Sequence, residues 1–290
     1  MTTEWVWIDS ASKLKKAQSN IKRASVVGVD TEYDSFRYFR EKLCLIQLIN
    51  GSTTFLFDPL ETLDITFLGN VFSDPTTLKI MHAADNDIRI LNRNYGFVFK
   101  NIFDTHRAAS LLGCKYLSLS NVVHQYLGVE FNKSKKVQRS QWDVRPLTEE
   151  QLQYAVRDTS YLVDLYRVLD AELKRENLAE KAREVFESLE RIRWSEKVLN
   201  PGGYIKIKGA DELEEGQQRR LRVLYLWRFE KARETNKARF MILSDQELVE
   251  LACAPIDELS SLAATAILSP RRIDEYGPDI VRVLREVAEK

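Results

Sequence analysis

The segment Asn200-Pro201-Gly202-Gly203 divides the 290-residue sequence into two parts with different hydrophobic patterns. Before it, short apolar runs rich in β-branched residues alternate with amphipathic segments, which is the pattern of alternating strands and helices. After it, apolar residues recur at helical spacing. Because adjacent Pro and Gly residues interrupt both helices and strands, we expect a linker here. The sequence therefore predicts an α/β domain followed by a small all-α domain.

The first part carries the signals of a mixed sheet. Asn50-Gly51 is a typical hairpin turn between two apolar runs. A hairpin followed by β/α alternation favours a mixed sheet flanked by helices. The expected strands are residues 25–30, 43–49, 54–57 and 78–81. Thr148 is the expected N-cap of one long helix over about residues 149–173.

The same patterns set the expected domain boundaries. We place an α/β domain at residues 1–175, a helical and loop linker at 176–205, and a helical domain at 206–290. Four helices are expected after the linker, at residues 213–235, 244–253, 256–265 and 273–288.

Composition narrows the class of protein. Lys plus Arg and Asp plus Glu each number 43, so the formal net charge is zero. Bulk positive charge is thus excluded as the basis of nucleic-acid binding, whereas a local basic patch is not. The sequence has neither a secretory signal nor a stretch of ~18 apolar residues, so no membrane partner is expected. Cys44, Cys114 and Cys253 are far apart, which suits a reducing compartment, and we expect a cytoplasmic protein.

Three segments carry acidic residues next to apolar runs. Asp30 and Glu32 are two residues apart on an expected strand, so they share a face, where two carboxylates repel each other unless a cation separates them. Tyr154 and Asp158 are one helical turn apart and share a helix face. Asp87 follows the apolar run at residues 78–81.

Each of these segments also has an ordinary explanation. An Asp-x-Glu pair occurs on solvated strand edges, and a Tyr–Asp pair occurs in plain helix packing. Asp85 is the better candidate for a helix N-cap, which leaves Asp87 in the first turn. One segment alone does not identify a site.

Taken together, the segments resemble the DEDD exonuclease superfamily, specifically the ribonuclease D type and its exosome-associated eukaryotic relatives. The three motifs are VVGVDTEYDS, KIMHAADNDIRIL and LQYAVRDTSYL. The acid of the second motif falls on Asp87, and Tyr154 indicates the tyrosine subclass. The segments LCLIQL, NIFDTHRAASLL and WDVRPLTEEQL are also similar to this family. The resemblance covers about residues 1–175 and implies an RNase H-like exonuclease domain.

The second part resembles the helical HRDC domain found in ribonuclease D and RecQ-type helicases. The similar segments are GGYIKIKGADEL, LRVLYLWRFEKARETN and SDQELVELACAPIDEL. The resemblance implies that this domain assists substrate binding or recruits a helicase or another RNA-processing factor.

The resemblance also implies a mechanism. The implied catalytic residues are Asp30, Glu32, Asp87, Tyr154 and Asp158. The four acids would bind two divalent cations, Mg²⁺ or Mn²⁺, which prefer oxygen ligands. Tyr154 would position the attacking water. The implied reaction releases nucleoside 5′-monophosphates from single-stranded RNA 3′ ends, with tRNA or other stable RNA processing as the implied role.

Further polar and aromatic residues are candidates for substrate contact. The candidates are Thr31, Gln47, His82, Lys133, Arg139 and Trp142. Basic residues of the loop at residues 132–145 would follow a phosphate backbone. Trp142 and either Phe36 or Tyr38 would stack on bases. The alternatives are a solvated loop, core packing for Trp142, and structural hydrogen bonds for Gln47 and His82. A DNA-directed exonuclease also remains open, because no residue identifiably reads a 2′-hydroxyl. The alternative from another class is a non-catalytic nucleic-acid-binding module.

Overall fold

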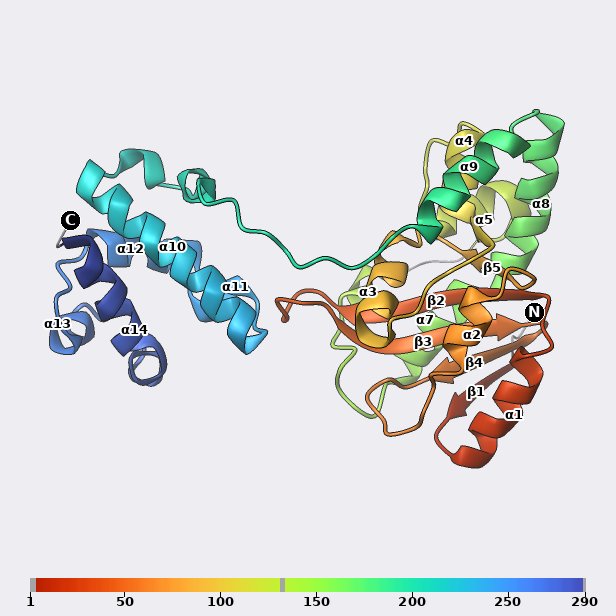
Figure 1. The fold of residues 1–290 in the computed structure, drawn as a ribbon, viewed down its shortest axis with the longest axis horizontal. Coiled ribbons are helices and arrows are strands. Elements are labelled where there is room, and N and C mark those ends of the chain that lie inside the picture. The colour runs from red at the N-terminus through yellow and green to blue at the C-terminus, as the bar shows by residue number, and fades with distance from the viewer. Residues whose placement is uncertain (1–3, 131–133, 289–290) are drawn as a thin grey trace. The chain divides into compact units, whose positions relative to one another are not determined.

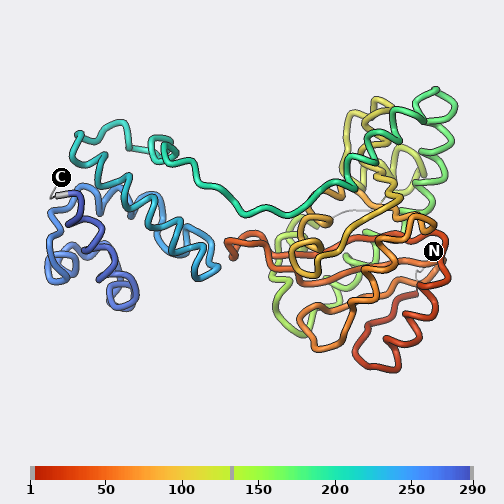
Figure 2. Tube along the Cα trace, in the orientation of Figure 1, coloured from red at the N-terminus to blue at the C-terminus, as the bar shows by residue number. Residues whose placement is uncertain are grey.

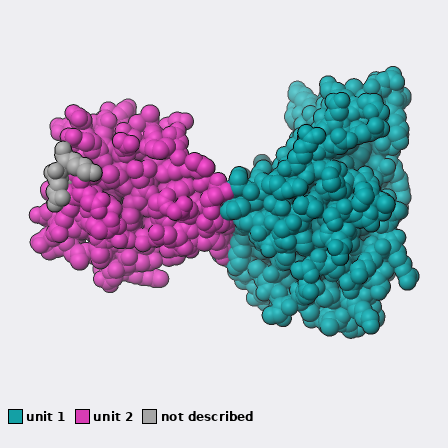
Figure 3. Space-filling view, in the orientation of Figure 1, with its two compact units in different colours: residues 1–34, 41–195 teal, residues 35–40, 196–290 magenta. Residues whose placement is uncertain are grey.

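The computed structural model describes residues 4–130 and 134–288 (Figure 1). The Cα trace is drawn in Figure 2, and the chain divides into two compact units, coloured separately in Figure 3. The first unit contains the described residues up to Asp34 and those from Glu41 to Ser195. The second contains Ser35–Arg40 and the described residues from Glu196 onward.

The first unit is α/β. Its strands are β1 (Glu4–Ile8), β2 (Val26–Asp34), β3 (Lys42–Asn50), β4 (Thr53–Phe57), β5 (Leu78–Met81) and β6 (Ile102–Asp104). Its helices are α1 (Ala11–Ile21), α2 (Leu68–Ser73), α3 (Asp85–Tyr95), α4 (Thr105–Leu111), α5 (Leu119–Leu127), α6 (Lys135–Gln138), α7 (Glu149–Ser160), α8 (Leu162–Arg175) and α9 (Ala179–Glu190).

The six strands form one mixed sheet in the order β1-β4-β3-β2-β5-β6. β2, β3 and β4 are antiparallel neighbours, and the turn at Asn50-Gly51 joins β3 to β4. β5 and β6 continue the sheet in parallel to β2, and β1 is parallel to β4. The predicted mixed sheet is confirmed, and the edge strands β1 and β6 are two more than the four strands expected from the sequence.

Helices cover both faces of this sheet (Figure 1). On one face α1, α2 and α3 enclose a core that includes Val29, Leu48 and Phe57. On the other face α7 packs on β2, β3 and β4, and α8 packs on β2 and β5. A Cβ at Gly28 would lie 2.6 Å from Ile49 Cγ2 and 3.3 Å from Leu162 Cβ. Glycine at this position of β2 therefore allows the α7–α8 junction to lie close to the sheet.

The long helix expected over residues 149–173 is instead two helices. Thr148 caps α7 as predicted, in a capping box with Gln151. The break falls at Tyr161, between α7 and α8. The hydroxyls of Thr159 and Ser160 donate to the Val156 carbonyl, at 3.1 and 2.7 Å, and such bonds compete with the helical backbone pattern.

The units also divide the chain differently from the expected boundaries. α9 falls in the expected linker, yet its Phe186 packs on Phe103 of β6 at 4.7 Å, within the first unit. Conversely, Ser35–Arg40, the loop between β2 and β3, belongs to the second unit. Both differences arise from tertiary packing, which a local pattern does not contain.

The second unit is helical, as predicted. Its helices are α10 (Glu215–Thr235), α11 (Arg239–Ile242), α12 (Asp245–Cys253), α13 (Leu259–Ala264) and α14 (Pro270–Ala288), preceded by the 3₁₀ turns η1 (Gly203–Lys206) and η2 (Ala210–Glu212). Ser244 and Glu247 form a capping box at α12. In the described part of the chain, no helix is both long enough and apolar enough to span a bilayer.

A buried ion pair fixes the segment that leads into α7. The Asp58 side chain is fully buried and accepts from Arg145 Nε at 2.5 Å and Nη2 at 2.8 Å. The same guanidinium donates to the carbonyls of Cys44 and Trp142, at 2.7 and 2.6 Å. Arg145 therefore links the end of β4, the strand β3 and the residues before α7.

Removing this guanidinium is expected to destabilise the first unit. In Arg145→Met the Asp58 charge and two carbonyls lose their donor, so the free energy of unfolding should fall by about 3–5 kcal/mol. The matched control is Arg167→Met, whose ion pair with Asp164 is exposed and worth under ~1 kcal/mol. Urea denaturation followed by circular dichroism measures both. Equal losses in the two variants would contradict the assignment.

Candidate active site

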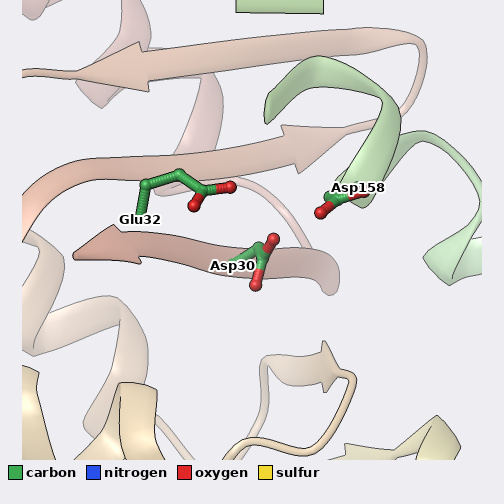
Figure 4. A group of neighbouring side chains, drawn as sticks. All are labelled: Asp30, Glu32 and Asp158. Carbon is green, nitrogen blue, oxygen red and sulfur yellow. The ribbon is translucent and has the colours of Figure 1, made fainter. Parts of the chain in front are cut away.

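Two elements bring the acidic residues together. Val27 and Val29 of β2 point into the core under α1–α3, so strand alternation places Asp30 and Glu32 on the opposite face. α7 covers that face and carries Asp158. Figure 4 shows the carboxylates of Asp30, Glu32 and Asp158 turned toward a common space. The register of β2 on β3 shifts directly after Glu32, a bulge of the kind found next to functional sites.

These three carboxylates form a group suited to a metal ion. One oxygen of each lies within 4.8 Å of the others. Glu32 and Asp158 are buried, with exposed fractions of 7% and 4%. Close, buried carboxylates repel each other, and a cation between them removes that repulsion. The all-oxygen donor set suits a hard divalent cation such as Mg²⁺ or Mn²⁺.

Gln47 adds an independent indication of a polar occupant. It lies directly across from Asp30 in the β2–β3 pair, so the two side chains share a face. Gln47 is fully buried, and within the described residues neither its amide nitrogen nor its amide oxygen has a hydrogen-bond partner. An unsatisfied buried amide costs ~1–3 kcal/mol. A hydrated ion bound beside Asp30 would relieve that cost, so the residues present fit the metal.

Tyr154 is held one helical turn before Asp158. Its ring lies 5.9 Å from that of Trp142, and only 8% of the residue is exposed. Burial raises the pKa of Tyr154 far above its ordinary value, and the charges of Asp158, Glu32 and Asp30 raise it further. The phenol therefore stays protonated and can orient a water molecule, but it is a poor base.

The fourth predicted acid, Asp87, lies outside the group of three. It is in the first turn of α3, and its carboxylate accepts a hydrogen bond from the Thr31 hydroxyl. Thr31 points to the opposite face of β2 from its neighbours Asp30 and Glu32. Burial raises the pKa of Asp87 to about 7. The predicted substrate contact Thr31 thus holds Asp87 beside the strand that carries the other acids.

Asp85, the expected N-cap of α3, is not the N-cap residue. The N-cap of α3 is Ala84, and Asp85 pairs with Arg107 at 2.7 Å instead. Asp104 accepts from the backbone N–H groups of Ala83 and Ala84, at 3.2 and 2.9 Å. Asp104 therefore fixes the turn that leads into α3, and the first turn of α3 has no side-chain cap.

Of the other candidate substrate residues, some have structural contacts and one is exposed to solvent. His82 has Thr105 Oγ1 2.8 Å from Nδ1 and the Leu117 carbonyl 3.0 Å from Nε2, which matches its structural alternative. Trp142 is 1% exposed and donates to the Gln138 carbonyl, so base stacking finds no support and core packing does. Arg139 is exposed at the end of α6. Lys133 lies outside the described residues.

Comparison with known families identifies the fold. The family model described as 3′-5′ exonuclease matches residues 5–174, and the HRDC domain model matches residues 217–284. The chain belongs to the 3′-5′ exonuclease family that includes ribonuclease D. Its exonuclease domain is RNase H-like, and the family depends on divalent metal ions. The chain is accordingly a metal-dependent 3′-5′ exonuclease with one matched HRDC domain.

Individual relatives agree with this family. The ribonuclease D of Desulfotalea psychrophila is 31% identical over 98% of this chain and 75% of its own length. The exosome complex component 10 homolog of Drosophila melanogaster is 29% identical over 90% of this chain, which spans only 30% of that relative. Escherichia coli RNase D superposes with a TM-score of 0.74 at 26% identity, covering 98% of this chain and 75% of that one. The catalytic core of RRP6 from Trypanosoma brucei shares the fold, with a TM-score of 0.90 at 23% identity over 99% of this chain and 80% of that chain.

The carboxylate group predicts a metal-dependent gain in stability. In chelator, Glu32→Gln should raise the free energy of unfolding by roughly 1–3 kcal/mol, because one repelling charge is removed. Mn²⁺ at 100 times its dissociation constant should add about 2.7 kcal/mol to the wild type and far less to the variant. Thermal unfolding with and without Mn²⁺ measures both effects.

The control for this experiment is Asp164→Asn, which removes an exposed carboxylate of α8. It should keep the full response to Mn²⁺. A Glu32→Gln protein that is stabilised by Mn²⁺ as much as the wild type would remove Glu32 from the metal site.

Proposed function

We propose that this chain removes nucleoside 5′-monophosphates one at a time from the 3′ end of single-stranded RNA. The observation that carries the proposal is the convergence of Asp30, Glu32 and Asp158 beside the protonated phenol of Tyr154. The similarity to ribonuclease D over nearly the whole chain supports RNA as the substrate. The Escherichia coli protein of that name is described as an exoribonuclease involved in structured RNA processing.

These residues have different roles in phosphodiester hydrolysis. A divalent cation, when bound, makes a water nucleophilic and stabilises the leaving oxygen. Asp30, Glu32 and Asp158 would hold this cation, and Asp87 would support a second one. Tyr154 orients the attacking water by hydrogen bonding, since its raised pKa prevents it from taking the proton. Trp142 packs on the ring of Tyr154 from within the core, and Gln47 lies across from Asp30 on the same face of the sheet.

Several finer expectations belong to the same proposal. Mg²⁺ or Mn²⁺ fills both ion positions, and the RNA is a tRNA or another stable RNA precursor. The HRDC domain contacts the RNA or a helicase or another RNA-processing factor. The protein acts in the cytoplasm.

The proposal predicts a metal-dependent ladder of products. Incubated with 5′-labelled single-stranded RNA, the wild type should shorten it one nucleotide at a time in Mg²⁺ or Mn²⁺ and leave it intact in chelator. Asp30→Asn should lower the rate by at least ~10³-fold, because a metal ligand is lost. Asp164→Asn should match the wild type. Binding without cleavage would reduce the protein to a nucleic-acid-binding module, and equal ladders on DNA would remove the RNA preference.

The positioning role of Tyr154 predicts a selective loss of kcat. Tyr154→Phe keeps the ring that packs on Trp142 and removes only the hydroxyl. We expect kcat to fall ~10²-fold, with KM and stabilisation by Mn²⁺ unchanged, because orientation of the water is lost but metal binding is not. Tyr116→Phe, at an exposed tyrosine, is the matched control. A kcat within twofold of the wild type would exclude this role.

A further inference from the structure

The loop Ser35–Arg40 is bound firmly within the second unit. The Phe39 side chain is 4% exposed and packs edge-on against Phe229 of α10 at 5.1 Å. The backbone of the loop pairs with the turn after α10: Phe39 N–H donates to the Asn236 carbonyl at 3.2 Å, and Ala238 N–H donates to the Arg37 carbonyl at 2.9 Å. Figure 2 shows this loop beside the turn. The residues at its tip therefore have a fixed place on the second unit.

Two aromatic rings remain exposed on this fixed surface. Phe36 of the loop is 67% exposed and Phe240 of α11 is 48% exposed, although each is a large apolar side chain. Their ring centroids lie 4.8 Å apart with an angle of 43° between the planes. The guanidinium of Arg37 lies 6.0 Å from the centroid of Phe36. Such a pair presents ring faces and edges to solvent instead of closing onto a core.

The rings border a cleft of the second unit with a positive lining. The cleft has a volume of about 960 Å³. Among the residues that line it, Lys197, Lys206, Arg228 and Arg239 are cationic, and Asp245 is acidic. The Asp245 carboxylate already pairs with the buried Arg228 at 2.8 Å, so it does not offset the other cations. The cleft thus combines positive charge with exposed aromatic faces.

We propose that this cleft is a binding site for single-stranded RNA, separate from the carboxylate site, in which bases stack on Phe36 and Phe240 and phosphates meet Lys206 and Arg239. Binding of single strands uses this combination of stacking platforms and a cationic groove. An acidic peptide would use the charges but would not need two exposed phenyl rings, so RNA accounts for more of the surface. The inference rests on the proposed function only for the choice of RNA over DNA.

The test measures RNA affinity of the full chain in chelator, where hydrolysis is prevented. Fluorescence anisotropy with a labelled 12-nucleotide single-stranded RNA should give a dissociation constant about tenfold higher for Phe36→Ala and for Phe240→Ala, and higher still for the double variant. Phe36→Tyr should restore binding, because stacking needs only the ring. Arg239→Gln should reduce the salt dependence of log K by about 0.7. Tyr116→Ala, an exposed aromatic of the first unit with Lys115 near its ring, is the control.

The outcomes separate this inference from the proposed function. A double variant that binds the 12-nucleotide RNA as tightly as the wild type overturns the inference. So does loss of binding to a poly-glutamate peptide with unchanged RNA affinity, since the cleft would then dock an acidic protein. With a trinucleotide the double variant should keep the wild-type kcat, because the carboxylate site is intact. Absence of cleavage by the wild type would defeat the proposed exonuclease and leave the anisotropy result standing.

Discussion

The mutual repulsion of three clustered carboxylates, two of them buried, is the constraint around which the first unit is organised. Asp30, Glu32 and Asp158 offer oxygens within 4.8 Å of one another, and two of the three residues are nearly inaccessible to water. Such an arrangement costs free energy, because each charge loses hydration and gains like-charged neighbours. The sheet and α7 must therefore hold the group against its own repulsion until a cation neutralises it.

Contacts on both faces of β2 hold the three carboxylates in place. On one face, Gly28 admits the α7–α8 junction, and the β4–α7 contact is completed by the Thr54 and Thr159 hydroxyls at 3.3 Å. On the other, Thr31 binds Asp87 at the start of α3. Arg145 fixes the segment before α7 to β3 and to Asp58. A single strand thus carries two acids on one side and positions a third on the other.

Features of the site that depend on residues close together in the sequence were predictable, and those that depend on contacts between distant residues were not. Alternation along β2 places Asp30 and Glu32 on one face from sequence alone, and helix periodicity does the same for Tyr154 and Asp158. The Arg145–Asp58 pair was not foreseen, since 87 residues separate the partners and neither belongs to a local pattern. The helix break at Tyr161 was missed because side-chain hydroxyls, not Pro or Gly, end α7. The role of Trp142 was open in the sequence, and only its packing on Tyr154 decides it.

The loop Ser35–Arg40 lies within the sequence of the first unit but belongs to the second. A division of the sequence into two consecutive domains does not show this. The chain passes from the first unit to the second after Asp34, returns after Arg40, and passes again after Ser195. Phe39, carried by the first of these passages, is part of the hydrophobic core of the second unit. A chain ending at residue 195 would therefore expose a phenyl ring whose burial is worth ~1.5–3 kcal/mol. The strand that carries Asp30 and Glu32 leads directly into that loop. The core of the HRDC unit therefore includes a residue from the connection between two exonuclease strands, although by sequence the HRDC unit is a separate domain.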